Sequence, residues 1–108
     1  MRPTLRALMP ALLGLGAGAA AQGEPLDAAA LRLASLAATC AQCHGTEGRA
    51  PADALAPALA GRPEALLRER LAEFQAGTRP ATVMTQLARG YQEAQLRGLA
   101  AYFAARSP

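Results

Sequence analysis

Cys40-Ala41-Gln42-Cys43-His44 decides the fold of this chain, because it holds both cysteines and the only histidine among the 108 residues. Two cysteines separated by two residues and followed directly by histidine are typical of a c-type haem attachment site. Residues three and four apart lie on one face at the end of a helix, so the three side chains are expected to share one surface. Each sulfur can add across one haem vinyl group, and His44 can then bind the iron. The motif predicts one covalent haem c.

Other interpretations of the same motif start from its cysteines. Structural zinc takes four ligands, and the chain provides only Cys40, Cys43 and His44 besides carboxylates. A thiol redox site of the thioredoxin type needs a βαβ context, which the sequence lacks. A structural disulfide in an exported chain would not need a histidine beside it. The adjacent histidine therefore favours haem over these alternatives.

The N-terminal stretch reads as a targeting segment and not as part of the fold. Two arginines precede an apolar, glycine-containing run over residues 7–19, and Ala19-Ala20-Ala21 satisfies the A-x-A cleavage rule. This pattern predicts a cleaved signal peptide over residues 1–21, one domain over 22–108 and a periplasmic location. The alternative is a retained N-terminal anchor, although the run is short and glycine-rich for a membrane span.

The charge balance excludes one class of partner. Residues 1–21 hold two of the eleven basic residues and none of the eight acidic ones, so residues 22–108 carry a formal charge of +1. Nucleic-acid binding leaves a basic stripe or an aromatic stacking platform, and neither is present. We expect no nucleic-acid partner, and no stable membrane insertion once residues 1–21 are removed.

Hydrophobic periodicity predicts an all-α domain of three to four helices around the haem. Asp27 is a suitable N-cap for a helix that runs to the cysteines, and glycines and prolines mark residues 45–63 as a loop. A second helix is expected from Pro63, at its first position, to Ala76, with Gly77 as its stop. A short turn within 81–89, closed by Gly90, and a last helix over about 92–105 complete the prediction.

The second axial position of the iron requires another ligand, because no other histidine exists. Met84 is the single methionine of residues 22–108, forty positions after His44. Its thioether is a soft ligand, and His/Met ligation raises the reduction potential of haem. The alternative role for Met84 is core packing. We expect the other ring nitrogen of His44 to donate to a carbonyl of the proline-rich loop, namely that of Pro57.

Taken together, these residues resemble the class I c-type cytochromes over nearly all of residues 22–108. Thr39–Gly45 looks like their haem motif, and Ala56–Gly61 looks like their Pro-x-Leu-x-Gly segment, whose proline carbonyl meets the proximal histidine. Met84 matches the distal ligand position, and Tyr102-Phe103 matches the aromatic pair of the terminal helix. The resemblance implies an electron-transfer protein that is not itself an enzyme. Because the haem would fill part of the interior, we also expect the chain without haem to show an apolar hollow between His44 and Met84.

The segment around Met84 carries the subfamily resemblance. Residues 79–91 are similar to the cytochrome subunit of flavocytochrome c sulfide dehydrogenases and to the two-haem cytochromes c4, although this chain has only one motif. The former implies a flavoprotein partner that oxidises sulfide and passes electrons to this haem. Alternatives are a free soluble carrier to a terminal oxidase, and a sensor or peroxidase-like protein with a labile sixth ligand. Arg79 is expected either to contact a haem propionate or to lie in solvent.

Overall fold

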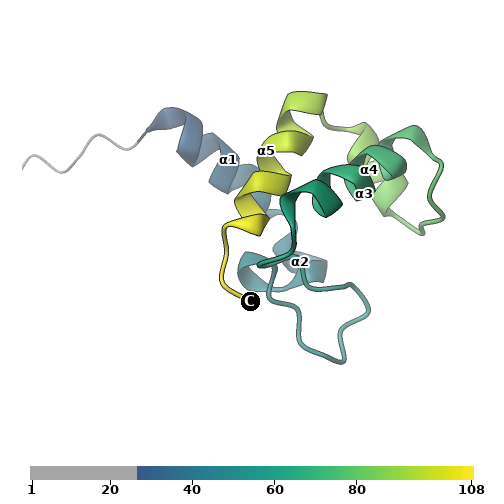
Figure 1. The fold of residues 1–108 in the computed structure, drawn as a ribbon, viewed down its shortest axis with the longest axis horizontal. Helices are drawn as coiled ribbons and strands as arrows, with labels where there is room; N and C mark the ends of the chain where they lie inside the picture. Colours follow the sequence, from purple (N-terminus) through teal and green to yellow (C-terminus); the bar gives the residue numbers. More distant parts are fainter. Residues whose placement is uncertain (1–26) are drawn as a thin grey trace, which may run out of the picture.

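The computed structural model describes residues 27–108, which form five α-helices and one 3₁₀ turn, with no β-strand in that range (Figure 1). The all-α prediction is confirmed. The predicted signal peptide over residues 1–21 lies outside the described residues. None of the helices within 27–108 is long and apolar enough to cross a bilayer. The elements are α1 (Ala28–Ala38), α2 (Ala41–His44), η1 (Thr46–Gly48), α3 (Glu64–Ala76), α4 (Met84–Arg89) and α5 (Glu93–Ala104).

Helix α1 begins at the predicted cap and lies across α5 (Figure 1). The carboxylate of Asp27 accepts a hydrogen bond of 2.9 Å from Ala29 N–H, which satisfies one of the free amides of the first turn. Gly98 permits the close approach of the two helices, because a Cβ there would lie only 3.1 Å from a methyl carbon of Leu33. The absence of a side chain at this position therefore sets how closely α1 packs on α5.

Helix α3 ends where the sequence predicted and begins one residue later. Pro63 has an extended ψ of 130° and is the N-cap, so the expectation that it occupies the first helical position was wrong by one residue. At the other end Gly77 adopts a left-handed φ of 77°, a conformation that costs glycine little, and its N–H donates to Phe74 O at 3.1 Å. Both ends follow from local backbone chemistry.

The predicted turn within residues 81–89 is helix α4, which is closed by Gly90. The last helix, α5, follows after three residues and carries a capping box, in which Gln92 N–H donates to Gln95 Oε1 at 2.8 Å. One face of α5 is apolar and buried. Together with α1 and α3 it forms the core, whose buried members are Ala37, Leu67, Leu96, Leu99, Ala100 and Phe103.

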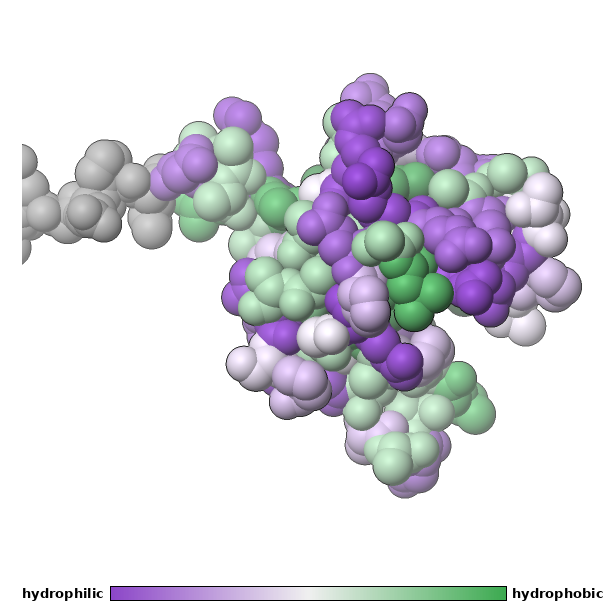
Figure 2. Space-filling view, in the orientation of Figure 1, coloured by the Kyte–Doolittle hydropathy of each residue, from purple (hydrophilic) through white to green (hydrophobic). Residues whose placement is uncertain are grey.

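Figure 2 shows that the hydropathy of the surface differs between the helices and the loop after η1. Hydrophilic side chains dominate over α3 and α5, with a small apolar patch among them beside α3. The loop that follows η1, which projects at the bottom of Figure 1, is mostly pale green and so only weakly hydrophobic. Leu55, a member of this loop, is fully exposed. The tip of the loop therefore lies outside the core, whereas Leu59 and Ala60 near its end pack against the core or are buried.

Candidate functional site

The Cys-x-x-Cys-His motif forms its own helical turn and does not end α1. The Thr39 hydroxyl donates to Leu36 O at 2.7 Å and closes α1. Cys40 is then the N-cap of α2, and His44 N–H donates to Cys40 O at 2.9 Å. Helix α1 therefore runs up to the cysteines as expected, and the motif adds a separate helical turn, which was not expected. The two cysteines and His44 nevertheless line one cavity, so they share a surface.

This cavity has a volume of about 930 Å³ and lies between α2, α3, α4 and the loop after η1. Ligand pockets in proteins span roughly 300–1,000 Å³, so it is large enough for a bulky ligand. Its walls are mainly apolar, and they include Leu59, Leu66, Leu71, Phe74, Val83 and Leu87. Two thiols and an imidazole on one apolar wall are the donor set that a covalent haem requires. The residues present therefore fit that group.

His44 is the one polar residue of the described chain that is buried, with 8% of its surface exposed. Its Nδ1 lies 2.6 Å from Pro57 O, and since a carbonyl oxygen can only accept, Nδ1 carries the proton. The loop that presents Pro57 is held in turn by Gly48, whose carbonyl accepts from Leu59 and Ala60 N–H at 2.8 and 3.1 Å. The ring is thereby fixed in orientation and in tautomer, which leaves Nε2 to act as a ligand.

Met84 is the first residue of α4, and it lines the same cavity as His44. Its side chain is half-buried. The apolar hollow expected between these two residues is present. A helix of six residues is too short to be stable by itself, so the position of Met84 depends on how α4 is held by its neighbours.

Arg79 lies at the cavity but already has an acidic partner. Its Nη1 is 3.0 Å from Glu73 Oε2, and Arg70 Nη1 reaches the same oxygen at 2.9 Å. The guanidinium of Arg79 also lies over the Phe74 ring, 5.7 Å from its centroid. The hydrogen bond from Arg70, and after it the one from Arg79, lowers the pKa of Glu73 below its ordinary value. Both arginines line the cavity.

The geometry gives little support to the non-haem interpretations of the motif. Burial raises the pKa of the Cys40 thiol, although a hydrogen bond with Thr39 partly opposes this. Reactive redox thiols have lowered pKa values, so Cys40 lacks that property. Within residues 27–108, no three His, Cys, Asp or Glu side chains come together in a group that could hold a metal ion by themselves.

Sequence reasoning missed a polar contact behind the motif. Glu47 adopts a positive φ of 56°, which is uncommon for a residue with a side chain. Tyr102 OH donates to its Oε1 at 3.0 Å, and Arg106 pairs with its Oε2 at 3.3 Å while lying over the Tyr102 ring. These contacts tie the end of α5 to η1. The one sequence signal for these contacts is Glu47 itself, an acidic residue between two glycines.

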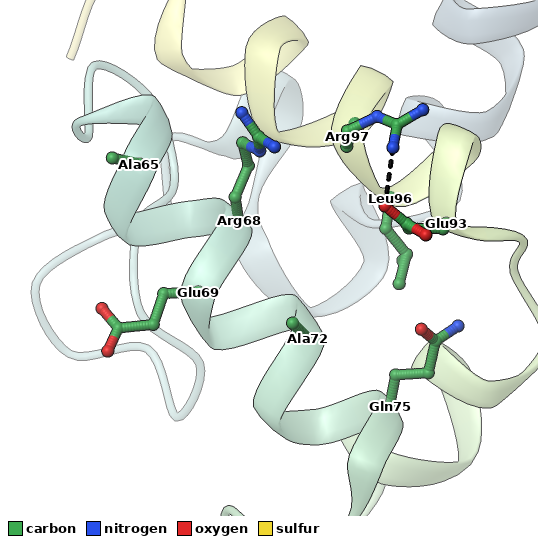
Figure 3. A pocket seen from close by; sticks show the side chains of 8 residues that line it. All are labelled: Ala65, Arg68, Glu69, Ala72, Gln75, Glu93, Leu96 and Arg97. Carbon is green, nitrogen blue, oxygen red and sulfur yellow. Dashed lines mark hydrogen bonds and ion pairs between the residues drawn. The ribbon is translucent and has the colours of Figure 1, made fainter.

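A second hollow, of about 380 Å³, lies between α3 and α5 (Figure 3). Glu93 and Arg97 form an ion pair of 2.6 Å along one side of it. At the end of α3 the Gln75 carboxamide lies near this hollow and donates to the carbonyls of Ala88 and Tyr91, at 3.3 and 2.8 Å. Sequence reasoning also missed Gln75, since nothing in the local pattern distinguishes it from a solvated glutamine.

Comparison with known proteins identifies similar chains. The sequence is 31% identical to the cytochrome subunit of sulfide dehydrogenase from Chlorobaculum tepidum, over 90% of this chain and 91% of that protein. It is 39% identical to a thiosulfate dehydrogenase electron acceptor from Thiomonas intermedia and 34% identical to cytochrome c4 from Azotobacter vinelandii. These alignments cover 67% and 95% of this chain, but 33% and 51% of the two relatives. No family model matches the sequence.

Proposed function

Because this chain belongs to the class I c-type cytochromes, electron-transfer proteins with covalently bound haem c, we propose that His44 and Met84 bind the two axial positions of its iron. Cys40 and Cys43 would supply the two thioether links. The observation that carries the proposal is that His44 and Met84 line the same apolar cavity. The hydrogen bond between His44 Nδ1 and Pro57 O supports it, because this bond orients the ring.

The bound haem supplies a one-electron couple between ferric and ferrous iron. Cys40 and Cys43 would hold it by thioether links, the apolar walls of the cavity would shield it from water, and the Met84 thioether would raise its electron affinity. With His44 and Met84 both bound to the iron, no position would remain open for a substrate. The protein then acts as a carrier of single electrons and makes or breaks no bond of a substrate.

The absorption spectrum of the holoprotein tests this ligation. Ferric wild-type protein is expected to show the methionine–iron charge-transfer band. Met84→Leu should abolish this band, lower the reduction potential and allow rapid carbon monoxide binding to the ferrous form, because leucine offers no lone pair to the iron. Gln86→Ala, an exposed position of the same helix, serves as the control and should change none of these. A wild-type spectrum without the band would instead support the alternative of a labile sixth ligand.

The redox partner is the finer part of the proposal. The relative from Chlorobaculum tepidum matches over almost its whole length and is named as a subunit of sulfide dehydrogenase, which favours a sulfide-oxidising flavoprotein as the electron donor. A second relative is named as the electron acceptor of thiosulfate dehydrogenase, so a free carrier is the alternative. Native purification with absorbance readings for both haem and flavin distinguishes them. A haem fraction free of flavin, from cells that oxidise sulfide, would contradict the subunit role.

Export to the periplasm belongs to the same proposal. The arginines, the apolar run and Ala19-Ala20-Ala21 support a signal peptide over residues 1–21, and c-type haem is attached after export. The intact mass of the purified holoprotein tests the cleavage site, since the chain should begin at Gln22. A mass that includes residues 1–21 would point to a retained anchor.

A further inference from the structure

Helix α4, which carries Met84, is held in place by its contacts with α3 and not by its own length. It has six residues and no side-chain hydrogen bond caps its N-terminus. Helices this short are not stable in water unless tertiary contacts hold them. Ala88, with 1% of its surface exposed, gives α4 one buried contact, while Leu87 is half exposed. A further restraint acts at the C-terminal end of the helix.

Gln75 supplies this restraint from α3. Its Nε2 donates to Tyr91 O at 2.8 Å and to Ala88 O at 3.3 Å, and the side chain is half-buried. Ala88 lies in the last turn of α4, and Tyr91 follows the Gly90 cap, so one acceptor is in the helix and the other directly after it. A carboxamide nitrogen has two hydrogens, one for each carbonyl. Figure 3 shows the carboxamide of Gln75 extending from α3 away from the helix axis. One side chain therefore joins α3 to the junction of α4 and α5.

Tyr91 continues this connection to the haem-attachment side of the cavity. Its hydroxyl lies 3.4 Å from Thr39 Oγ1, and Thr39 precedes Cys40. Tyr91 also lines the cavity itself. Tyr91 thus contacts Gln75 through its backbone carbonyl and the end of α1 through its side-chain hydroxyl. It links the helix that bears Met84 with the segment that bears Cys40.

We propose that Gln75 is a positioning residue for the distal ligand, holding α4 so that the Met84 sulfur stays within reach of the iron. This inference rests on the ligation proposed above. Gln75 acts through the backbone of Ala88 and Tyr91 and does not itself touch the haem. Loss of its hydrogen bonds should raise the population of the methionine-dissociated form by about threefold to tenfold, the range for a lost hydrogen bond.

The test compares the holoproteins of Gln75→Glu and Gln75→Leu with wild type. Glutamate has the same shape but no hydrogen to donate, and leucine removes the polar group entirely. Both variants should lose the ferric methionine–iron band at lower temperature than wild type and bind carbon monoxide faster in the ferrous form. Amide hydrogen exchange should accelerate within residues 84–89 and remain unchanged in α1, a readout that does not depend on ligation.

Two controls separate positioning from general destabilisation. Gln86→Glu and Gln86→Leu make the same chemical changes at an exposed position of α4 and should leave the band unchanged. Leu33→Ala removes packing between α1 and α5, far along the chain from Met84, and lowers global stability. At matched global stability, Leu33→Ala should retain the band over a wider temperature range than the Gln75 variants.

The outcomes distinguish this inference from the proposal on which it rests. A wild-type holoprotein without the band would overturn the ligation by Met84, and with it the role of Gln75 toward the iron. A normal wild-type band that survives equally in the Gln75 variants, with unchanged exchange in α4, would overturn the role of Gln75 alone. An equal effect of Leu33→Ala would also overturn it, because the loss would then reflect global loosening.

Discussion

At the scale of single residues, Glu73 is the acceptor that fixes two arginines at the cavity. Its lowered pKa means that the folded state binds a proton there less readily than the unfolded state does. The stabilisation is therefore present above the ordinary carboxyl pKa of roughly 4.3 and is lost as the pH falls through the lower folded-state pKa. Surface ion pairs contribute little individually, so the effect should be small.

Glu73→Gln tests this interpretation. The variant holoprotein should be less stable than wild type at about pH 7, and the difference should shrink at about pH 3, as Glu73 of the wild type takes up its proton. Urea unfolding followed by circular dichroism at the two pH values gives the comparison. Glu93→Gln, which removes the carboxylate of the exposed pair with Arg97, is the matched control and should show a smaller dependence. Equal pH dependence of the two variants would contradict a special role of Glu73.

At the scale of elements, local chemistry made helix ends predictable. Asp27 caps α1 with its carboxylate, and Gly77 ends α3 through a left-handed φ that glycine adopts easily. Pro63 was misplaced by one residue because proline fixes φ but leaves ψ free, and an extended ψ makes it the cap. The separation of α2 from α1 was missed, since it depends on the Thr39 hydroxyl bonding to Leu36 O and on no change of hydrophobic period.

The candidate site divides in the same way. The motif could be named because a covalent haem requires two thiols beside a histidine. Met84 could be named because it is the single methionine of residues 22–108, and Pro57 because it lies in the proline-rich loop after the motif. The two thiols, the histidine, Met84 and Pro57 all line the cavity. Gln75 and Glu47 could not be named. Their partners lie 13 to 16 positions away for Gln75 and 55 or more for Glu47, where neither helical period nor turn chemistry constrains the sequence. Only the fold brings these groups together.

At the scale of the whole molecule, the fold encloses more apolar space than its own side chains fill. The buried core cluster has six members, two of which are alanines, and no large side chain of the described residues is completely buried. Beside it lies the apolar cavity of about 930 Å³. Small domains are marginally stable even with a filled core. The haem must therefore supply apolar contacts that the chain lacks.

The double variant Cys40→Ala/Cys43→Ala, which cannot form the thioether links, tests this dependence. A ligand that binds only the native state stabilises it, so the haem-free variant should have low helicity, bind a hydrophobic dye and lack a cooperative urea transition. Circular dichroism and dye fluorescence measure this. Met84→Leu keeps both cysteines and should remain cooperative, which separates loss of the haem from loss of one iron ligand. A haem-free variant that unfolds cooperatively with native helicity would contradict this prediction. The packing of the helices alone would then be enough to stabilise the fold around an empty cavity.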